Sequence, residues 1–292
     1  METLEKFYAK YPLQTVKLKS GKNFNYRYHK NKNAKATIVL LTGGIGLSDL
    51  FYLHFQKFAE EFSVITFDYQ IQFENNKNFA DAVAELLKKL DERVWLVGQS
   101  LGGIVAQIIT KEHPEVVEGL VLSNTCSLEK DMSKEAYDHL MSMIENQQKS
   151  KKLLKILPFG LYKKLIAKAV MKKTSSLNAE EKALMKGLCD AMLKLLTREY
   201  ELHMIDFLID AKNHFGMARA DFAAFENKVL LILSEDDHTF NQSCKNSLIH
   251  IMPSPKVVTD LTGGHLALLV RLDSYAELVM KFIKDKTLYE LA

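Results

Sequence analysis

The chain has 292 residues, of which 47% are hydrophobic and 26% are charged, and its formal net charge is +3. These proportions are ordinary for a soluble globular protein with a sizeable core, and the small net charge excludes an electrostatic argument for nucleic-acid binding. Cys126, Cys189 and Cys244 are too few and too widely spaced for a disulfide framework or a metal cluster. No signal core and no membrane-length apolar run is found, so we expect a cytoplasmic protein without metal or cofactor.

The first part of the chain alternates between strand and helix patterns. Amphipathic helices are predicted over residues 50–61, begun by Ser48 or Asp49, and over residues 79–90, capped by Asn78. Extended or apolar runs predict strands at residues 15–19, 24–29, 36–41, 63–67, 94–97 and 119–122. This alternation is typical of an α/β sheet protein.

The pattern changes after Asn124. Residues 127–213 hold lysine-rich helical patterns and no convincing strand, with a break at residues 158–160. The elements predicted after this segment are two strands and a closing helix, at residues 228–233, 256–259 and 266–283. We therefore predict an α/β core of residues 1–126 and 214–292, interrupted by an all-helical insertion of residues 127–213.

The stretch VWLVGQSLGGIVAQII, residues 94–109, places Ser100 between a buried strand and a buried helix. Apolar residues run without alternation before the serine and recur at helical spacing after it. A turn this tight leaves no room for side chains two positions to either side, where Gly98 and Gly102 stand, and Gly103 lets the helix approach the sheet. The pattern predicts a nucleophile elbow, and a serine that only caps the helix is the structural alternative.

A serine nucleophile needs a basic residue, and that base needs an acid to orient it. The strand pattern VLLILS leads directly into Glu-Asp-Asp-His, and the loop LTGGH places His265 between the last strand and the last helix. The order serine, acid, histidine is the one found in α/β-hydrolases. The chain therefore resembles the α/β-hydrolase fold family, with a mostly parallel sheet flanked by helices and a helical cap inserted after the sixth strand.

This resemblance implies a catalytic triad of Ser100, Asp237 and His265. In the family the acid usually stands three residues after a glycine that ends the seventh strand, and Ser234 occupies that place here. This register selects Asp237, while Asp236 stays open as the acid because the two positions differ by one residue. Of the competing histidines, His238 should point away from the pocket that its neighbour Asp237 faces, and His250 fits a structural role.

The resemblance also implies an oxyanion hole made of backbone amides. Leu101, directly after the nucleophile, should supply one donor, and Gly44, in the loop after the third strand, should supply the other. Thr42 departs from the family, which commonly has a histidine there to brace this loop. A phosphate-binding loop is the alternative, although no Gly-x-Gly-x-x-Gly or Walker pattern is present.

A serine at the elbow favours acyl transfer, whereas relatives that open epoxides or displace halides carry aspartate there. We expect an esterase acting on small-molecule esters of a small or medium apolar acyl group. Thioester hydrolysis, C–C bond hydrolysis and acyl transfer to another acceptor use the same triad and stay open. A non-catalytic binding module with this fold is the alternative of a different class.

The segment from Lys149 to Lys173 holds nine lysines and no acidic residue. On a helix begun at Leu161, lysines occupy one half of the circumference and apolar side chains fill the other half. The apolar set is Leu161, Tyr162, Leu165, Ile166, Ala169 and Val170. We expect this half to form a lid over the pocket that admits an apolar acyl chain. The less favoured alternative is that the basic half contacts something anionic, either a membrane surface or the head group of a charged acyl substrate.

Overall fold

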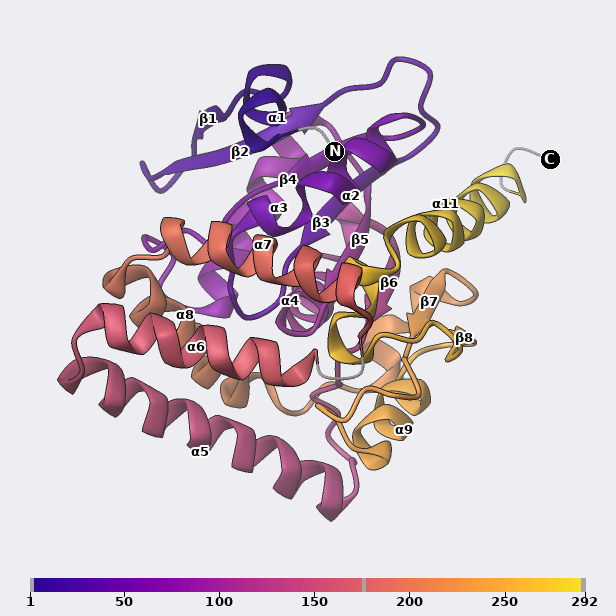
Figure 1. The fold of residues 1–292 in the computed structure, drawn as a ribbon. Helices are drawn as coiled ribbons and strands as arrows, with labels where there is room; N and C mark the ends of the chain where they lie inside the picture. The colour runs from indigo at the N-terminus through magenta and orange to yellow at the C-terminus, as the bar shows by residue number, and fades with distance from the viewer. Residues whose placement is uncertain (1–2, 175–176, 290–292) are drawn as a thin grey trace.

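The computed structural model describes residues 3–174 and 177–289, and its centre is one eight-stranded sheet (Figure 1). The strand order is β1-β2-β4-β3-β5-β6-β7-β8, with antiparallel pairing of β1 with β2 and of β2 with β4, and parallel pairing from β4 onward. The strands are β1 (Gln14–Lys17), β2 (Asn23–His29), β3 (Thr37–Leu41), β4 (Ser63–Thr66), β5 (Val94–Gln99), β6 (Val117–Ser123), β7 (Val229–Ile232) and β8 (Lys256–Val258). This sheet confirms the predicted α/β class and the eight predicted strands.

Helices cover both faces of the sheet. Side chains alternate between the two faces along a strand, so Val39 and Leu41 pack with α3 and α4, while Ile38 and Leu40 pack with α2 and α11. Burial on both faces is the physical reason why the central strands carry apolar residues without alternation. The core helices are α1 (Leu4–Lys10), α2 (Tyr52–Ala59), α3 (Asn76–Leu90), α4 (Leu101–Glu112), α9 (Gln242–Ile251), α10 (Ala267–Val270) and α11 (Leu272–Tyr289).

Three helix boundaries differ from the sequence prediction. The N-cap of α3 is Asn75, whose side chain accepts a hydrogen bond from the amide of Asn78, the residue predicted as the cap. The helix predicted from residue 50 begins instead with a 3-10 turn at Ser48–Phe51 and continues as α2. The closing helix is interrupted at Arg271, whose guanidinium pairs with the Glu181 carboxylate from another part of the chain.

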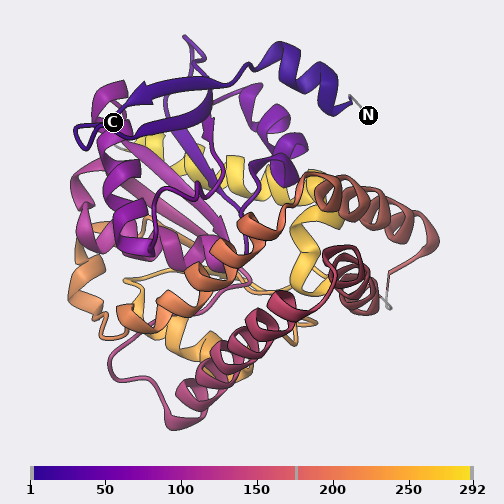
Figure 2. The ribbon, with the colours of Figure 1, turned by 90° about the vertical axis from the view of Figure 1, so that its left-hand side faces the viewer.

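In the part of the chain that the structure describes, four α-helices follow β6 and precede β7, and they lie together on one side of the molecule (Figures 1 and 2). They are α5 (Lys134–Ile156), α6 (Phe159–Lys173), α7 (Ala179–Leu195) and α8 (Arg198–Asp210). We call residues 127–213 the helical segment, and its treatment as a separate unit stays our proposal. The break predicted at residues 158–160 falls at Leu157 and Pro158, and Phe159 already belongs to α6. Over residues 3–174 and 177–289, no helix is long and apolar enough to cross a membrane.

Candidate active site

Ser100 lies at the turn between β5 and α4, in a strained backbone conformation with φ of 54° and ψ of −119°. A Cβ atom on Gly98 would overlap the backbone of Gly102, and a Cβ atom on Gly102 would overlap the carbonyl of Leu41. Neither neighbour can yield, because both are backbone atoms of the central sheet and its helix. The turn therefore requires glycine at both positions, and it lifts the Ser100 side chain above the carboxyl edge of the sheet.

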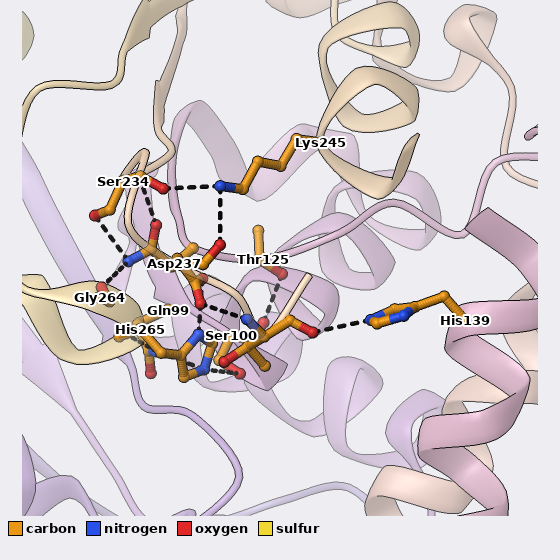
Figure 3. A network of polar contacts seen from close by, with 11 residues as sticks. Gln99, Ser100, Thr125, His139, Ser234, Asp237, Lys245, Gly264 and His265 are labelled. Atoms are coloured by element: carbon orange, nitrogen blue, oxygen red, sulfur yellow. Dashed lines mark hydrogen bonds and ion pairs between the residues drawn. The ribbon is translucent and has the colours of Figure 1, made fainter. Parts of the chain in front are cut away.

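His265 bridges Ser100 and Asp237 (Figure 3). Its Nδ1 lies 2.9 Å from Asp237 Oδ2, and its Nε2 lies 3.0 Å from Ser100 Oγ. Burial alone would raise the pKa of Asp237, but hydrogen bonds from His265 and from the amide of Thr239 outweigh it and hold that pKa below its ordinary value. The ionised carboxylate then accepts from Nδ1–H, which leaves Nε2 without a proton and able to accept a hydrogen bond from the Ser100 hydroxyl.

Asp236, the alternative acid, faces a different partner. Its Oδ2 accepts a hydrogen bond of 2.9 Å from the amide of Gly263, which helps to fix the loop that carries His265. His238 is exposed, and His250 lies at the surface with its Nδ1 2.5 Å from the buried carboxylate of Glu129. Among the candidate acids and bases in the described residues, Asp237 and His265 are the pair that contact each other, and His265 also contacts Ser100.

The predicted oxyanion donors lie on the two loops that border Ser100. A Cβ atom on Gly43 would lie 3.3 Å from Ser100 Cβ, so the loop after β3 passes close to Ser100, and Gly44 borders the same cavity as Ser100. Leu101 begins α4, where the amide has no partner within the helix. Within the described residues, neither the Gly44 amide nor the Leu101 amide donates to another group of the protein. Both amides are therefore available to a bound oxyanion.

Thr42, which stands where the family commonly has histidine, is buried at the start of the same loop. Its carbonyl accepts a hydrogen bond of 2.7 Å from the Tyr69 hydroxyl, while its own hydroxyl has no partner in the described structure. The Tyr69 side chain is itself fully buried. This hydrogen bond fixes the start of the loop after β3, at the position where the family commonly has a histidine.

Asn124 connects two loops of the site. One is the loop after β7 that carries Asp237, called here the acid loop, and the other is the loop after β8 that carries His265, called the histidine loop. The sequence pattern did not indicate Asn124 as a site residue. Its Nδ2 donates to Ser234 Oγ at 3.1 Å and to the Gly264 carbonyl at 2.9 Å, and its Oδ1 accepts from the Ser234 amide at 2.8 Å. The backbone of Asn124 has a φ of 41°, a left-handed conformation that asparagine tolerates better than most residues. No local motif marks this residue, because its partners lie far away in the sequence.

Lys245 lies on α9 and its side chain contacts the acid loop. The sequence pattern did not indicate this residue either. Its side chain is buried, and its Nζ donates to the Ser234 carbonyl at 2.8 Å and to the Asp237 carbonyl at 3.1 Å (Figure 3). Lysine is rarely buried without a polar partner. The two carbonyl groups therefore account for its position, and they fix the backbone on both sides of Asp236.

Two more side chains reach the site. Gln99, the residue before Ser100, is buried with its Nε2 3.3 Å from His265 Nε2 and 3.2 Å from the His265 carbonyl. His139, from α5 in the helical segment, has its Nε2 2.9 Å from the Thr239 carbonyl on the acid loop. Gln99 falls inside the elbow motif at a position whose residue type is variable, so the motif itself gave no signal for it.

Two cavities meet at Ser100. The larger has a volume of about 170 Å³ and reaches from Gly44 and His265 toward α6 and α7. The smaller has a volume of about 70 Å³ and extends from Ser100 and Leu101 toward α5 and α8. Both are lined mainly by apolar side chains.

Helix α6 turns a narrower face inward than the sequence predicts. Ile166 and Val170 border the larger cavity and Tyr162 is buried, but Leu161 and Leu165 are 47% and 43% exposed. The helix packs through Tyr162 into a small apolar cluster with side chains of α5 and α8, and this orientation leaves the two leucines outside. Ala169 is exposed as well, so the expectation that the whole apolar half covers the pocket is wrong for Leu161, Leu165 and Ala169.

Known proteins that resemble this chain include two curated relatives matched over part of their sequence and many solved structures. The chain is 25% identical over 132 residues to "Putative carbamate hydrolase RutD" of Agrobacterium fabrum, covering 41% of this chain and 51% of that protein. It is 27% identical over 156 residues to "Putative esterase/lipase" of Haemophilus influenzae, covering 48% and 54%. The chain thus spans about half the length of these curated relatives.

A thermophilic esterase from Thermogutta terrifontis, solved with malate bound, superposes with a TM-score of 0.73 at 15% identity, covering 94% of this chain and 98% of that one. At this identity the likeness shows the fold alone. The family model described as alpha/beta hydrolase fold matches residues 36–272, which include the strands from β3 to β8 and the loops of Ser100, Asp237 and His265. The chain therefore belongs to the α/β-hydrolase fold family.

Proposed function

We propose that this protein is a serine hydrolase that acts through an acyl-enzyme, on carboxylic esters of a small or medium apolar acyl group. The observation that carries the proposal is the position of His265, whose two ring nitrogens lie within hydrogen-bond distance of Ser100 Oγ and of the buried Asp237 carboxylate. A serine, a base and an orienting acid in this arrangement are the requirements of nucleophilic acyl transfer.

In the proposed reaction, His265 Nε2 takes the proton from Ser100 Oγ while this oxygen attacks the carbonyl carbon of the ester. The carbonyl oxygen becomes an oxyanion that accepts hydrogen bonds from the amides of Gly44 and Leu101. The bond to the leaving oxygen then breaks, and His265 gives its proton to that oxygen. Water, deprotonated by the same imidazole, attacks the acyl-enzyme, releases the carboxylic acid and regenerates Ser100.

The names of the matched relatives agree with this class of reaction. Hydrolysis of a carbamate and hydrolysis of an ester both begin with attack on a carbonyl carbon, and the named relatives include both activities. The apolar lining of the cavities favours an ester with apolar substituents. The steps above use only side chains and amides of the chain and need no metal or cofactor. A cytoplasmic location stays a prediction.

Two measurements test the proposal together. A fluorophosphonate probe should label the protein with one probe per chain at Ser100, and the protein should hydrolyse p-nitrophenyl acetate. Ser100→Ala should abolish the labelling and leave the melting temperature within a few degrees of the parent. An intact, folded protein that neither reacts with the probe nor hydrolyses the ester would instead be a binding module.

A further inference from the structure

The two cavities at Ser100 differ in size and in the catalytic groups that border them. His265 and Gly44 border the larger cavity, of about 170 Å³, and not the smaller one. Leu101 borders the smaller cavity, of about 70 Å³, and not the larger one. Ser100 borders both, so a substrate carbonyl carbon bonded to Ser100 Oγ has one substituent in each direction.

Within the described residues, the ionisable side chains that border the two cavities are His265 and the thiols of Cys126 and Cys189. The polar side chains at the walls are uncharged amides such as Gln99 and Gln147. A charged substituent would lose its hydration there without gaining a partner, which costs several kcal/mol or more. The cavities therefore favour substituents that are neutral and apolar on both sides of the scissile bond.

The position of His265 decides which substituent enters which cavity. In acyl transfer the imidazole that accepts the serine proton must pass it to the leaving oxygen, so this oxygen has to lie near His265 Nε2. With the oxyanion held between the Gly44 and Leu101 amides, the remaining substituent is left to the cavity that His265 does not border. The leaving group therefore enters the larger cavity and the acyl group enters the smaller one.

The volumes indicate the size of the substituent that each cavity can enclose. An apolar protein cavity of about 150 Å³ accommodates benzene, which corresponds to about 25 Å³ for each non-hydrogen atom. On this scale the larger cavity holds about seven non-hydrogen atoms and the smaller cavity about three. Resting on the function proposed above, we infer that the preferred substrate is a neutral ester of a short acyl chain, about three carbons beyond the carbonyl, with a bulkier alcohol the size of an aromatic ring.

The walls of the two cavities come from different helices of the helical segment. Ile166 and Val170 of α6, with Met192 of α7, line the alcohol side. Met143 and Ile144 of α5 line the acyl side. The lid formed by α6 therefore covers the alcohol, and α5 sets the length of the acyl chain, whereas the sequence analysis expected the α6 face to admit the acyl chain.

Two isomeric esters test this assignment. Benzyl butyrate carries the small group on the acyl side and the ring on the alcohol side, and propyl phenylacetate has the same atoms with the two groups exchanged. Both release a primary alcohol, so the intrinsic reactivity of the leaving groups is similar. Benzyl butyrate should have a kcat/KM at least about tenfold higher, because a methylene that a pocket cannot hold already costs about tenfold. Equal values or the reverse preference would overturn the assignment.

A pair of matched variants localises the effect. Met143→Ala enlarges the smaller cavity and should raise kcat/KM for propyl phenylacetate by about tenfold relative to benzyl butyrate. Leu165→Ala, an exposed change on α6 that borders neither cavity, is the control and should leave that ratio unaltered. Ile144→Val is a milder alternative on the acyl side if Met143→Ala does not fold. A ratio that neither acyl-side variant changes, or that Leu165→Ala changes as much as they do, would contradict the inference.

The failure of this inference and the failure of the proposed function are separable. If Ser100 reacts with the fluorophosphonate and p-nitrophenyl acetate is hydrolysed, but neither isomer is a substrate, the cavity assignment is wrong and the serine hydrolase stands. If Ser100 does not react and no ester is hydrolysed, the proposed function is wrong, and the assignment of the cavities falls with it.

Discussion

The loops at the carboxyl edge of the sheet and the helical segment of residues 127–213 border the candidate site in different ways. In the loops, hydrogen bonds with the side chains of Asn124 and Lys245 fix the backbone around Asp237 and His265. The helical segment lines the cavities mainly with apolar side chains. Hydrogen bonds are directional and apolar contacts are not. The loops can therefore fix the reacting atoms, while the helical segment sets the shape of the substrate.

The largest effects should come from the loops. Ser100→Ala and His265→Ala should each lower kcat by about 10³ to 10⁶, because either change removes the proposed nucleophile or its base. His238→Ala is the matched control, since this histidine is exposed beside the acid and has no contact with Ser100 in our proposal. Ester hydrolysis and thermal melting should be measured for all three. A loss from His238→Ala equal to that from His265→Ala would exclude the assigned base.

Substitution of the two neighbouring aspartates should have clearly different effects on kcat. Asp237→Asn should lower kcat by about 10³ to 10⁴, because an amide in place of the carboxylate no longer stabilises the charged imidazole or its required tautomer. Asp236→Asn should cost much less, since an amide oxygen can still accept from the Gly263 amide. Kinetics at equal thermal stability decides between them, and a greater loss from Asp236→Asn would reverse our assignment of the acid.

Asp237 also makes a pH-dependent contribution to folding. Its pKa is lower in the folded protein than in the unfolded chain, because the hydrogen bonds from His265 and Thr239 outweigh burial. The resulting stability is fully present above about pH 4, the ordinary range of an aspartate, and is lost as the pH falls through the lower folded pKa. Urea unfolding at several pH values should therefore show that Asp237→Asn flattens the acid side of the stability profile. An unchanged profile would contradict this origin of the lowered pKa.

Lys245 gives an intermediate effect, because it acts on the reacting groups only through the acid loop. Lys245→Met leaves the carbonyls of Ser234 and Asp237 without their donor, which should cost about 1 to 3 kcal/mol in unfolding free energy. We expect kcat to fall by about tenfold with little change in KM, since a shift of about 1.4 kcal/mol corresponds to that factor. Lys281→Met, an exposed change on α11, is the control. A folded Lys245→Met with full kcat would show that the lysine only stabilises the fold.

Smaller effects are expected from the helical segment. Ile166 borders the larger cavity, whereas Leu165, one residue earlier on α6, is 43% exposed. Ile166→Ala should raise KM for benzyl butyrate a few-fold, by about the 1 kcal/mol that a partly buried aliphatic contact is worth, and Leu165→Ala should leave KM unchanged. Equal effects of the two changes would mean that α6 does not face the cavity as the structure has it.

The smallest effect concerns the basic surface of α6. A helix that lies in a membrane interface needs its apolar face free, and here Ile166 and Val170 already face the cavity. We therefore expect no co-sedimentation with anionic vesicles at low salt. Binding to anionic but not neutral vesicles, lost on addition of salt, would show instead that the exposed leucines and the lysines of α6 meet a membrane surface.

The sequence by itself determined the local features of this protein. The alternating strands and helices follow from apolar periodicity within short runs of residues. The turn at Ser100 follows from Gly98 and Gly102, because only glycine leaves the backbone space that such a turn needs. The helix ends were less predictable, and the cap at Asn75 was misplaced by three residues because several asparagines nearby could serve as caps.

Only the tertiary structure decided which side chains meet at the site. Asn124 and Ser234 are 110 residues apart, and nothing next to either one in the sequence indicates the other. The pairing of Asp237 rather than Asp236 with His265, the burial of Lys245 and the outward position of Leu161 depend in the same way on how distant elements pack. Sequence patterns encode steric preferences between near neighbours, whereas these contacts depend on the simultaneous positions of several loops and helices.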